Sequence, residues 1–330
     1  MKALSFASAT STAAALFGLI CVVGDAHAQT IQLKASHHDA IGTPIDLGMN
    51  RLVRLVDERS NGRIKITLFP ANQLGSEPQG VEGMSLGQID LGAVVGATYG
   101  AFIEEANVLG MLYTFRNVDH MQKAMNGLLG KVLSDKLLAQ MKIRMLDGTW
   151  YFGTRQITAK KAINTPNDLA GLKLRVVPVP VYRVGWTHMG ATATPIVGAD
   201  LFSAIQTGVV DAQENPPPIS KGYGILQVHN HLMLSNHVIA NVAVAMSEAT
   251  WQRLNPADRG LIQQAAKDAG EFQKKTAIAA EATVIEEFRK AGGKVIEPDL
   301  EAFRAKAAGI PSVFMGGKFK ELYSAVRAIN

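Results

Sequence analysis

Strands and helices alternate along the first half of this chain, as they do in proteins built on parallel sheets. Residues 31–36 and 64–69 alternate apolar and polar side chains, which predicts two strands, and a helix is expected between them from about Thr43-Pro44 to the turn at residues 60–62. A short helix over about 78–86 then leads into a strand over 89–95. Because a strand–helix–strand unit joins parallel strands, this order predicts a mainly parallel sheet covered by helices.

The second half of the chain repeats this order. A strand is predicted over 172–177, a helix over 199–207 and a strand over 209–213. The helical pattern over about 255–291 is long for one small domain, and a helix of that length could lie across two. A strand over 294–296 and a last helical region follow. The repetition predicts two similar α/β domains.

The N-terminal segment has the pattern of an export signal. Lys2 is followed by an apolar stretch over 13–23 and by Ala26-His27-Ala28, which has the small residues of a signal-peptidase site. We therefore assign residues 1–28 to a signal peptide cleaved after about Ala28, and expect the mature protein in the periplasm. Cys21 is the only cysteine, so the mature chain would have no disulfide, thiol nucleophile or cysteine metal ligand.

The composition excludes several classes of partner. The net charge is +5 and aromatic residues make up 6% of the chain, with no aromatic-plus-basic run, so nucleic-acid binding is not expected. A mild positive field does favour an anionic solute. No later stretch has the length of a membrane span, so the mature chain should not insert into a membrane. Neither glycine-rich nucleotide motif is present, and we expect no cofactor.

The histidines do not predict a metal site. His37 and His38 are adjacent, and neighbouring side chains of a strand point to opposite faces. His229 and His231 have a better spacing, but no carboxylate lies nearby in the sequence to complete a ligand set.

Two arginines are the best candidates for binding an acid. Arg155 and Arg175 lie in the patterned stretches 153–156 and 171–176. A guanidinium is a planar fork of donors that matches a carboxylate two bonds at a time. Arg175 also lies toward the carboxyl end of a predicted strand, where ligands of α/β sheets gather. The alternative is that both form ordinary ion pairs.

Four further residues are candidates, each with a structural alternative. Asn215 precedes three prolines that hold the backbone extended, which suits a fixed amide donor, although an Asx turn is also possible. His38 could hydrogen-bond a ligand or cap a helix. Glu77 could face a ligand or stabilise the start of the predicted helix at 78. Trp150 could pack against a ligand or in the core.

One motif points to a different function. Residues 83–87, Gly-Met-Ser-Leu-Gly, match the G-x-S-x-G pattern of serine hydrolases around Ser85. That motif needs a strand before the serine and a helix after it. The predicted order here is the reverse, so a secreted hydrolase is only a remote alternative.

Several segments in a fixed order resemble those of the solute-binding proteins of tripartite ATP-independent periplasmic (TRAP) transporters. The resemblance covers essentially residues 29–330. The matching segments are 60–64 (Ser-Asn-Gly-Arg-Ile), 69–75 (Phe-Pro-Ala-Asn-Gln-Leu-Gly), 153–155 (Gly-Thr-Arg), 163–169, 171–175 (Gly-Leu-Lys-Leu-Arg), 190–195 and 201–216. The ordered set is more specific than any single segment.

The resemblance implies a two-lobed α/β fold of the periplasmic-binding-protein type, with two domains joined by hinge strands and a long connecting helix. One lobe would comprise residues 29–152 with about 240–280, and the other 153–239 with about 281–330. The ligand would lie in the cleft between them, its carboxylate clamped by Arg175. The resemblance also implies ligand contacts for Arg155, Asn215 and His38, and integral membrane permease subunits as partners. The protein would then be a receptor and no enzyme.

The ligand class stays open at this stage. The segment 90–97 lacks the acidic and basic residues of sialate-binding relatives, and Gly198 stands where an aromatic residue often does. These departures argue against sialic acid. A sugar acid such as a uronate is favoured slightly, while a C4-dicarboxylate, a 2-oxo or 2-hydroxy acid, or a role in another class of importer are the alternatives.

Overall fold

The computed structural model describes Met1, residues 30–314 and residues 317–330, and the predicted signal peptide, apart from Met1, lies outside these residues. The first half contains β1 (Ile31–Ser36), α1 (Pro44–Arg59), β2 (Ile64–Phe69), α2 (Glu77–Ser85), β3 (Leu91–Val95), η1 (Gly96–Ala101), η2 (Glu104–Gly110), α3 (Val118–Asn126), α4 (Leu128–Lys136), η3 (Leu137–Met141) and β4 (Ile143–Ala159). The second half contains η4 (Pro166–Leu169), β5 (Lys173–Val176), α5 (Pro180–His188), β6 (Thr192–Pro195), η5 (Gly198–Asp200), α6 (Leu201–Gln206), β7 (Ala212–Asn215), α7 (Pro217–Gly222), η6 (Ile225–Gln227), β8 (His231–Ser247), α8 (Glu248–Arg253), α9 (Pro256–Lys290), β9 (Lys294–Ile296), α10 (Leu300–Ala307), α11 (Ile310–Phe314) and α12 (Gly317–Arg327).

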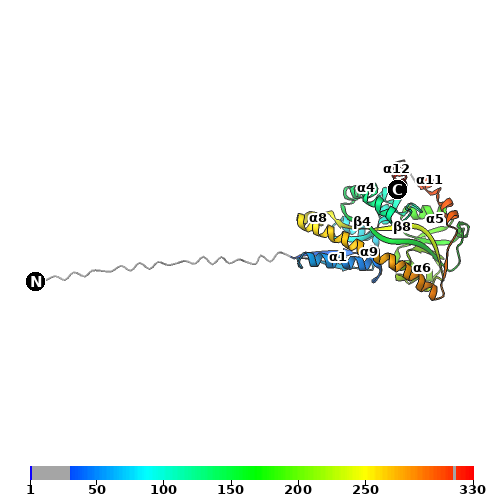
Figure 1. The fold of residues 1–330 in the computed structure, drawn as a ribbon, viewed down its shortest axis with the longest axis horizontal. Coiled ribbons are helices and arrows are strands. Elements are labelled where there is room, and N and C mark those ends of the chain that lie inside the picture. The colour runs from blue at the N-terminus through cyan, green and yellow to red at the C-terminus, as the bar shows by residue number, and fades with distance from the viewer. Residues whose placement is uncertain (2–29, 315–316) are drawn as a thin grey trace.

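The described strands form one sheet that runs through two α/β lobes (Figure 1). Its order is β2-β1-β3-β8-β4-β7-β5-β6, and β9 pairs with β8. The pairs β1–β2 and β1–β3 are parallel at one end, and β5–β6 and β5–β7 are parallel at the other. Each end therefore has the parallel strands that the strand–helix–strand order predicts. The two-lobed α/β fold is confirmed, while the residue boundaries of the lobes remain a prediction.

Two long strands connect the lobes. β4 and β8 each have 17 residues and pair antiparallel with each other, with register shifts along the way. The C-terminal half of β8 also pairs with β3, whereas the C-terminal end of β4 pairs with β7. Each strand thus belongs to one lobe at one end and to the other lobe at the other end. No hydrophobic pattern in the sequence had marked their full length.

One position of β4 has a backbone conformation and a close contact that only glycine allows. Gly153 has φ +138°, in a register shift between Tyr151 and Gly153. A Cβ atom there would lie 2.5 Å from Cβ of Pro216. Both the dihedral angle and the close approach therefore require glycine two residues before Arg155.

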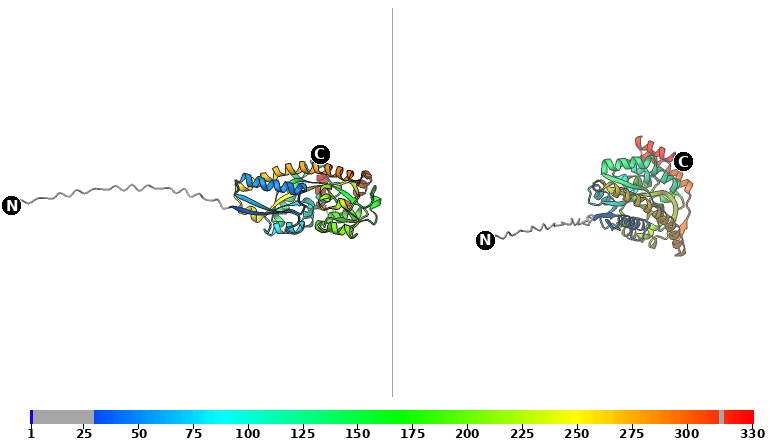
Figure 2. Two further views of the ribbon diagram at one scale, coloured as in Figure 1. Left: turned by 90° about the horizontal axis from the view of Figure 1, so that it is seen from below. Right: turned by 60° about the vertical axis from the view of Figure 1, so that its left-hand side comes forward.

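Helix α9 lies across both lobes, as its predicted length suggested. Asn255 caps its N-terminus, where the Asn255 side chain accepts from the Asp258 amide at 2.9 Å. It packs against α1 and β4, and against α7 and β9. Figure 2 shows it extending along the molecule, beside α1 at one end. The helix forms a common support for the two lobes.

Two predicted strands begin two or more residues later than expected. β3 starts at Leu91 because the Asp90 carboxylate accepts bonds from the Lys34 amide at 2.7 Å and the Thr250 hydroxyl at 2.6 Å. β7 covers 212–215, whereas the prediction was 209–213. Val209 is exposed and Val210 packs in a small core below α6, so neither belongs to the sheet. The shift places Asn215 within the strand.

Candidate ligand-binding site

A cavity lies where residues of both lobes meet. It contains about 600 Å³ of space not filled by protein atoms, a figure that includes the open mouth. The lining residues are His38, Asn72, Ser76, Glu77, Pro78, Val95, Thr98, Phe152, Arg155, Arg175, Val177, Pro178, Val179, Tyr182, Val197, Gly198, Asn215 and Tyr223. Five of the six candidate residues are among them, and Trp150 is not.

Arg175 is buried in the wall of this cavity without an acidic partner. It lies on β5, paired with Thr194 on one side and Gln213 on the other, and is 3% exposed. Its Nε donates to the Ile196 carbonyl at 2.7 Å, but its two terminal nitrogens make no hydrogen bond or ion pair with a described residue. Burial lowers the pKa of Arg175 to about 10. The guanidinium therefore presents unused donors to the cavity.

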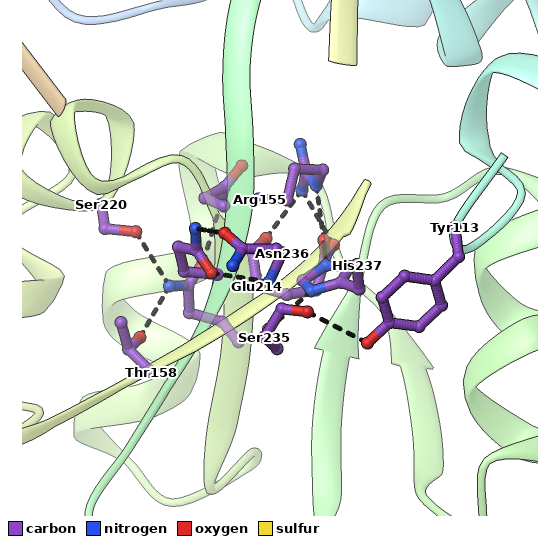
Figure 3. Close-up of polar contacts among 11 residues, drawn as sticks. Tyr113, Arg155, Thr158, Glu214, Ser220, Ser235, Asn236 and His237 are labelled. Atoms are coloured by element: carbon purple, nitrogen blue, oxygen red, sulfur yellow. Dashed lines mark hydrogen bonds and ion pairs between the residues drawn. The ribbon is translucent and has the colours of Figure 1, made fainter. Parts of the chain in front are cut away.

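Arg155 is already engaged by a buried carboxylate (Figure 3). Its Nε donates to Oε2 of Glu214, and its Nη2 donates to Oε1 and to the backbone carbonyl of Glu214 at 2.8 and 2.7 Å. Burial alone would raise the pKa of Glu214, but Arg155 and His237 hold it near 2. Arg155 thus keeps only Nη1 for a ligand, and Glu214 offsets its charge.

His237 holds Glu214 from the opposite side. Its Nε2 lies 2.9 Å from Oε2 of Glu214, and its Nδ1 lies 2.8 Å from the Ser235 hydroxyl. Burial lowers the pKa of His237, so the neutral ring donates from Nε2 to the carboxylate and accepts at Nδ1. Figure 3 shows the contacts extending past Ser235, whose backbone carbonyl accepts from the hydroxyl of Tyr113 at 3.0 Å. Nothing in the spacing of these residues along the sequence revealed the network.

Asn215 is buried at the end of β7, opposite Gln156 of β4. Its Nδ2 donates to Oε1 of Gln213 at 2.9 Å, and Gln213 in turn donates to Thr158 at 2.7 Å and to Ser220 at 3.1 Å. The side chain is therefore held by Gln213 of its own strand, and the Asx-turn alternative does not apply. Its carbonyl oxygen makes no bond to the residues described and is available to a ligand.

Glu77 and His38 line the cavity from the other lobe, where Glu77 adds an acidic group opposite the arginines. Glu77 accepts from the Val95 amide and the Thr98 hydroxyl, both at 2.6 Å, and lies 3.1 Å from Nδ1 of His38. Ser76 and Gln79 form the helix cap, and Glu77 is the acidic residue of the first turn of α2, so it lies both at the helix start and at the cavity. Burial raises the pKa of Glu77 despite these donors. The cavity therefore has a carboxylate on one wall and arginines on the other.

Two tyrosines complete the lining, and sequence reasoning missed both. Tyr182 is fully buried and Tyr223 is partly buried, and neither buried hydroxyl has a hydrogen-bond partner among the described residues. A Cβ atom at Gly198 would lie 2.5 Å from the Tyr223 hydroxyl, so the small residue makes room for this ring. An aromatic residue thus reaches the region of Gly198 from another segment. The only signal in the sequence was the glycine itself.

Trp150 belongs to the core, so its proposed role at the ligand was wrong. It is fully buried, and its Nε1 donates to the Ala266 carbonyl of α9 at 3.0 Å. A Cβ atom at Gly270 or Gly48 would lie within 3 Å of its ring, which shows how closely α9 and α1 approach it. Phe152, two residues further along β4, is the aromatic residue that lines the cavity.

The other functions considered find little support in the described residues. No group of three His, Cys, Asp or Glu residues there is arranged to hold a metal ion. Ser85 is the last residue of α2, before β3, and no bond joins it to a histidine in residues 30–314 or 317–330. The order that the hydrolase motif needs is therefore reversed. Within the same ranges no helix has the length and apolarity of a membrane span.

Comparison with known proteins agrees with the sequence resemblance. Residues 35–313 match the model of the bacterial extracellular solute-binding proteins, family 7. The chain is 32% identical over 273 residues to the sialic acid-binding periplasmic protein SiaP of Vibrio cholerae, covering 82% of this chain and 84% of that one. It is 28% identical to the 2,3-diketo-L-gulonate-binding periplasmic protein YiaO of Escherichia coli, over 76% of each chain.

Two solved structures have the same fold and hold sugar acids. A TRAP periplasmic solute-binding protein of Sulfitobacter sp. NAS-14.1 with bound β-D-galacturonate has a TM-score of 0.86 and 28% identity, covering 90% of this chain and all of that chain. One from Polaromonas sp. JS666 bound to D-erythronate also has a TM-score of 0.86, with 30% identity, covering 91% and 99%.

Proposed function

This chain belongs to family 7 of the bacterial extracellular solute-binding proteins, and from that premise we propose that it captures a sugar acid with one carboxylate. It is a solute-binding receptor of the TRAP transporter type. The chain would act in the periplasm after cleavage near Ala28 and deliver its ligand to integral membrane permease subunits. The lobes would close over the ligand, which is a shift of population toward the closed form.

The buried guanidinium of Arg175 carries this proposal. A buried cation without a partner is unfavourable, and an incoming carboxylate would supply the missing charge and two hydrogen-bond acceptors. Arg155 would add one donor, since Glu214 occupies the rest of its fork. Arg175 is therefore the main carboxylate-binding residue, and Arg155 adds one further hydrogen-bond donor that Glu214 holds in position.

The opposite wall favours hydroxyl groups over a second acid. Glu77 would accept hydrogen bonds from ligand hydroxyls, together with Tyr182, Tyr223 and Asn215. A dicarboxylate would bring its second negative charge toward the Glu77 carboxylate in a largely desolvated space, which is unfavourable. This arrangement favours a sugar acid over a C4-dicarboxylate. The bound sugar acids of two related structures support the same class.

The proposal is tested by a thermal-shift series on the purified mature protein. D-glucuronate, D-galacturonate and D-erythronate are compared with succinate, pyruvate and sialic acid, because a ligand at a given concentration raises the apparent stability more when it binds more tightly. We expect stabilisation by at least one sugar acid, and its loss in Arg175→Ala. Stabilisation only by succinate or pyruvate would contradict the ligand class. A shift that persists in Arg175→Ala would contradict the clamp.

A further inference from the structure

A second depression lies beside the hinge strands and shares no residue with the ligand cavity. Measured in the same way, it contains about 1760 Å³ of empty space, against about 600 Å³ for the ligand cavity. We call it the basic groove. Its lining residues are Leu112, Tyr113, Phe115, Arg116, Thr154, Asn236, Ile239, Arg304, Ala307, Ala308, Pro311, Lys320, Tyr323, Ser324 and Arg327.

The charged residues that line this groove all have the same sign. Four of its lining residues are cationic and none is acidic, and none of the four forms an ion pair with a described carboxylate. Arg116 and Arg327 donate to backbone carbonyls, Arg116 to that of Arg327 at 3.1 Å and Arg327 to that of Tyr113 at 2.7 Å. Arg304 lies over the Tyr113 ring at 5.7 Å, and Lys320 makes no hydrogen bond to any residue described. Arg304 and Lys320 therefore keep their donors for an anion.

Apolar side chains lie between these cations, beside the polar Thr154 and Asn236. They are Leu112, Phe115 and Ile239 on one side and Ala307 of α10 and Pro311 of α11 on the other. A site that combines apolar side chains with cations suits a ligand that carries both apolar groups and negative charges. A free metabolite anion would leave these apolar side chains uncovered.

The position of the groove connects it to the hinge. Thr154 lines the groove and Arg155 lines the ligand cavity, so consecutive residues of β4 point to the two sites. Tyr113 and Asn236 both have positive φ angles, 58° and 46°, which asparagine tolerates but which are strained for tyrosine. Such strain is found at functional sites more often than elsewhere. Tyr113 also donates to the Ser235 carbonyl, next to the His237 that holds Glu214.

We propose that the basic groove binds an acidic amphipathic segment of a protein partner. Its carboxylates would meet Arg304 and Lys320, and its apolar side chains would cover those of the groove. A peptide can enter a concave groove, whereas a flat bilayer surface cannot reach the apolar side chains that line it. The size of the groove also fits several residues of peptide. If the proposed transport function holds, the permease is one partner that could supply this segment.

The test uses a dye-labelled helical peptide with leucine at i, i+3, i+4 and i+7 and glutamate elsewhere, and measures fluorescence anisotropy with the mature protein. A peptide with lysine in place of glutamate is the probe control. Arg304→Glu with Lys320→Glu reverses the two free cations. Lys275→Glu with Lys290→Glu on α9 changes the net charge equally, at exposed residues outside the groove. Vesicles of anionic phospholipid test the alternative source of negative charge.

We expect binding of the acidic peptide, weakened about tenfold or more by the groove pair and unchanged by the α9 pair. Three results would each overturn the inference. The first is no binding of the acidic peptide, the second is equal weakening of its binding by both pairs of substitutions, and the third is that only the binding of vesicles, and not that of the peptide, depends on the groove pair. A thermal shift with D-glucuronate, measured on the same variants, reports the ligand cavity separately. If the groove variant loses peptide binding but keeps the thermal shift with D-glucuronate, the effect is assigned to the groove. If the unaltered protein shows no thermal shift with D-glucuronate, that result counts against the ligand proposal alone.

Discussion

The two arginines of the cavity should respond in opposite ways to the same substitution. In the ligand-free protein Arg175 is a buried cation without a carboxylate partner, whereas Arg155 is paired with the buried Glu214. Methionine is an apolar side chain of similar length. Arg175→Met removes an unfavourable buried charge, while Arg155→Met leaves the Glu214 charge buried without its main partner.

The magnitudes follow from this difference. Breaking a buried ion pair by removing one partner costs about 3–5 kcal/mol. With an unfolding entropy of about 2.1 cal/mol/K per residue over about 300 residues, this loss lowers Tm by about 5–8 °C in Arg155→Met. For Arg175→Met we expect the Tm of the ligand-free protein to stay the same or to rise.

Ligand binding should show the reverse order. Loss of a desolvated charge pair with the ligand costs about 2–5 kcal/mol, so Arg175→Met should weaken D-glucuronate binding at least about 30-fold. The assays are thermal unfolding of protein freed of ligand by partial unfolding and refolding, and calorimetric titration with D-glucuronate. A Tm that falls equally in both variants, or an Arg175→Met protein with unchanged affinity, would refute this assignment of roles.

Three further perturbations test other parts of the account. Glu77→Gln should reduce the preference for D-glucuronate over D-glucarate, which carries a second carboxylate at its other end. If the ratio of the two affinities measured by calorimetry is unchanged, Glu77 does not determine ligand specificity. Glu281 of α9 accepts hydrogen bonds from the Thr154 amide at 2.5 Å and the Tyr151 hydroxyl at 2.8 Å. Burial raises the pKa of Glu281 to about 6, so its protonated form stabilises the fold by about 2 kcal/mol below about pH 4.5, and this contribution is lost as pH rises through 6. Glu281→Gln should remove that decline from a Tm series between pH 4 and 7, and an identical decline in both proteins would contradict it. Gly153→Ala should lower Tm and slow ligand binding more than Gly208→Ala does. Both residues have positive φ, but only the Cβ at position 153 would meet Pro216. Equal effects of the two substitutions in stopped-flow and thermal measurements would mean that this close approach is unimportant.

The alternation of side chains predicted the parallel part of the fold well. β1, β2 and β9 have the predicted bounds, because a strand with one buried face must alternate. The long strands β4 and β8 were not visible in this way. They are buried along most of their length, so apolar residues occur on both faces and no period of two remains.

The candidate site was accessible from the sequence only in part. The placement of Arg175, Arg155 and Asn215 at the cavity was expected from the segments 171–175, 153–155 and 201–216, although Arg155 lies inside β4 and not at its end. Tyr182 and Tyr223 come from a helix and a loop whose approach depends on the packing of the whole lobe. The position of Trp150 likewise depends on α9, more than one hundred residues away along the chain, which the pattern around Trp150 cannot encode.

The division of charge within the cavity also required the structure. Glu214, which neutralises Arg155, lies in the matching segment 201–216, but the resemblance assigned it no role. Sequence reasoning therefore placed Arg155 at the ligand beside the Arg175 clamp, without an internal partner. The structure gives Arg155 an internal partner and leaves Arg175 without one.

The most direct measurement is a crystal structure of the mature protein with D-glucuronate. The account predicts that both carboxylate oxygens lie within hydrogen-bond distance of the two terminal nitrogens of Arg175, with sugar hydroxyls near Glu77 and the Arg155–Glu214 pair intact. A carboxylate bound elsewhere in the cavity, with Arg175 still unpaired or turned to solvent, would contradict it.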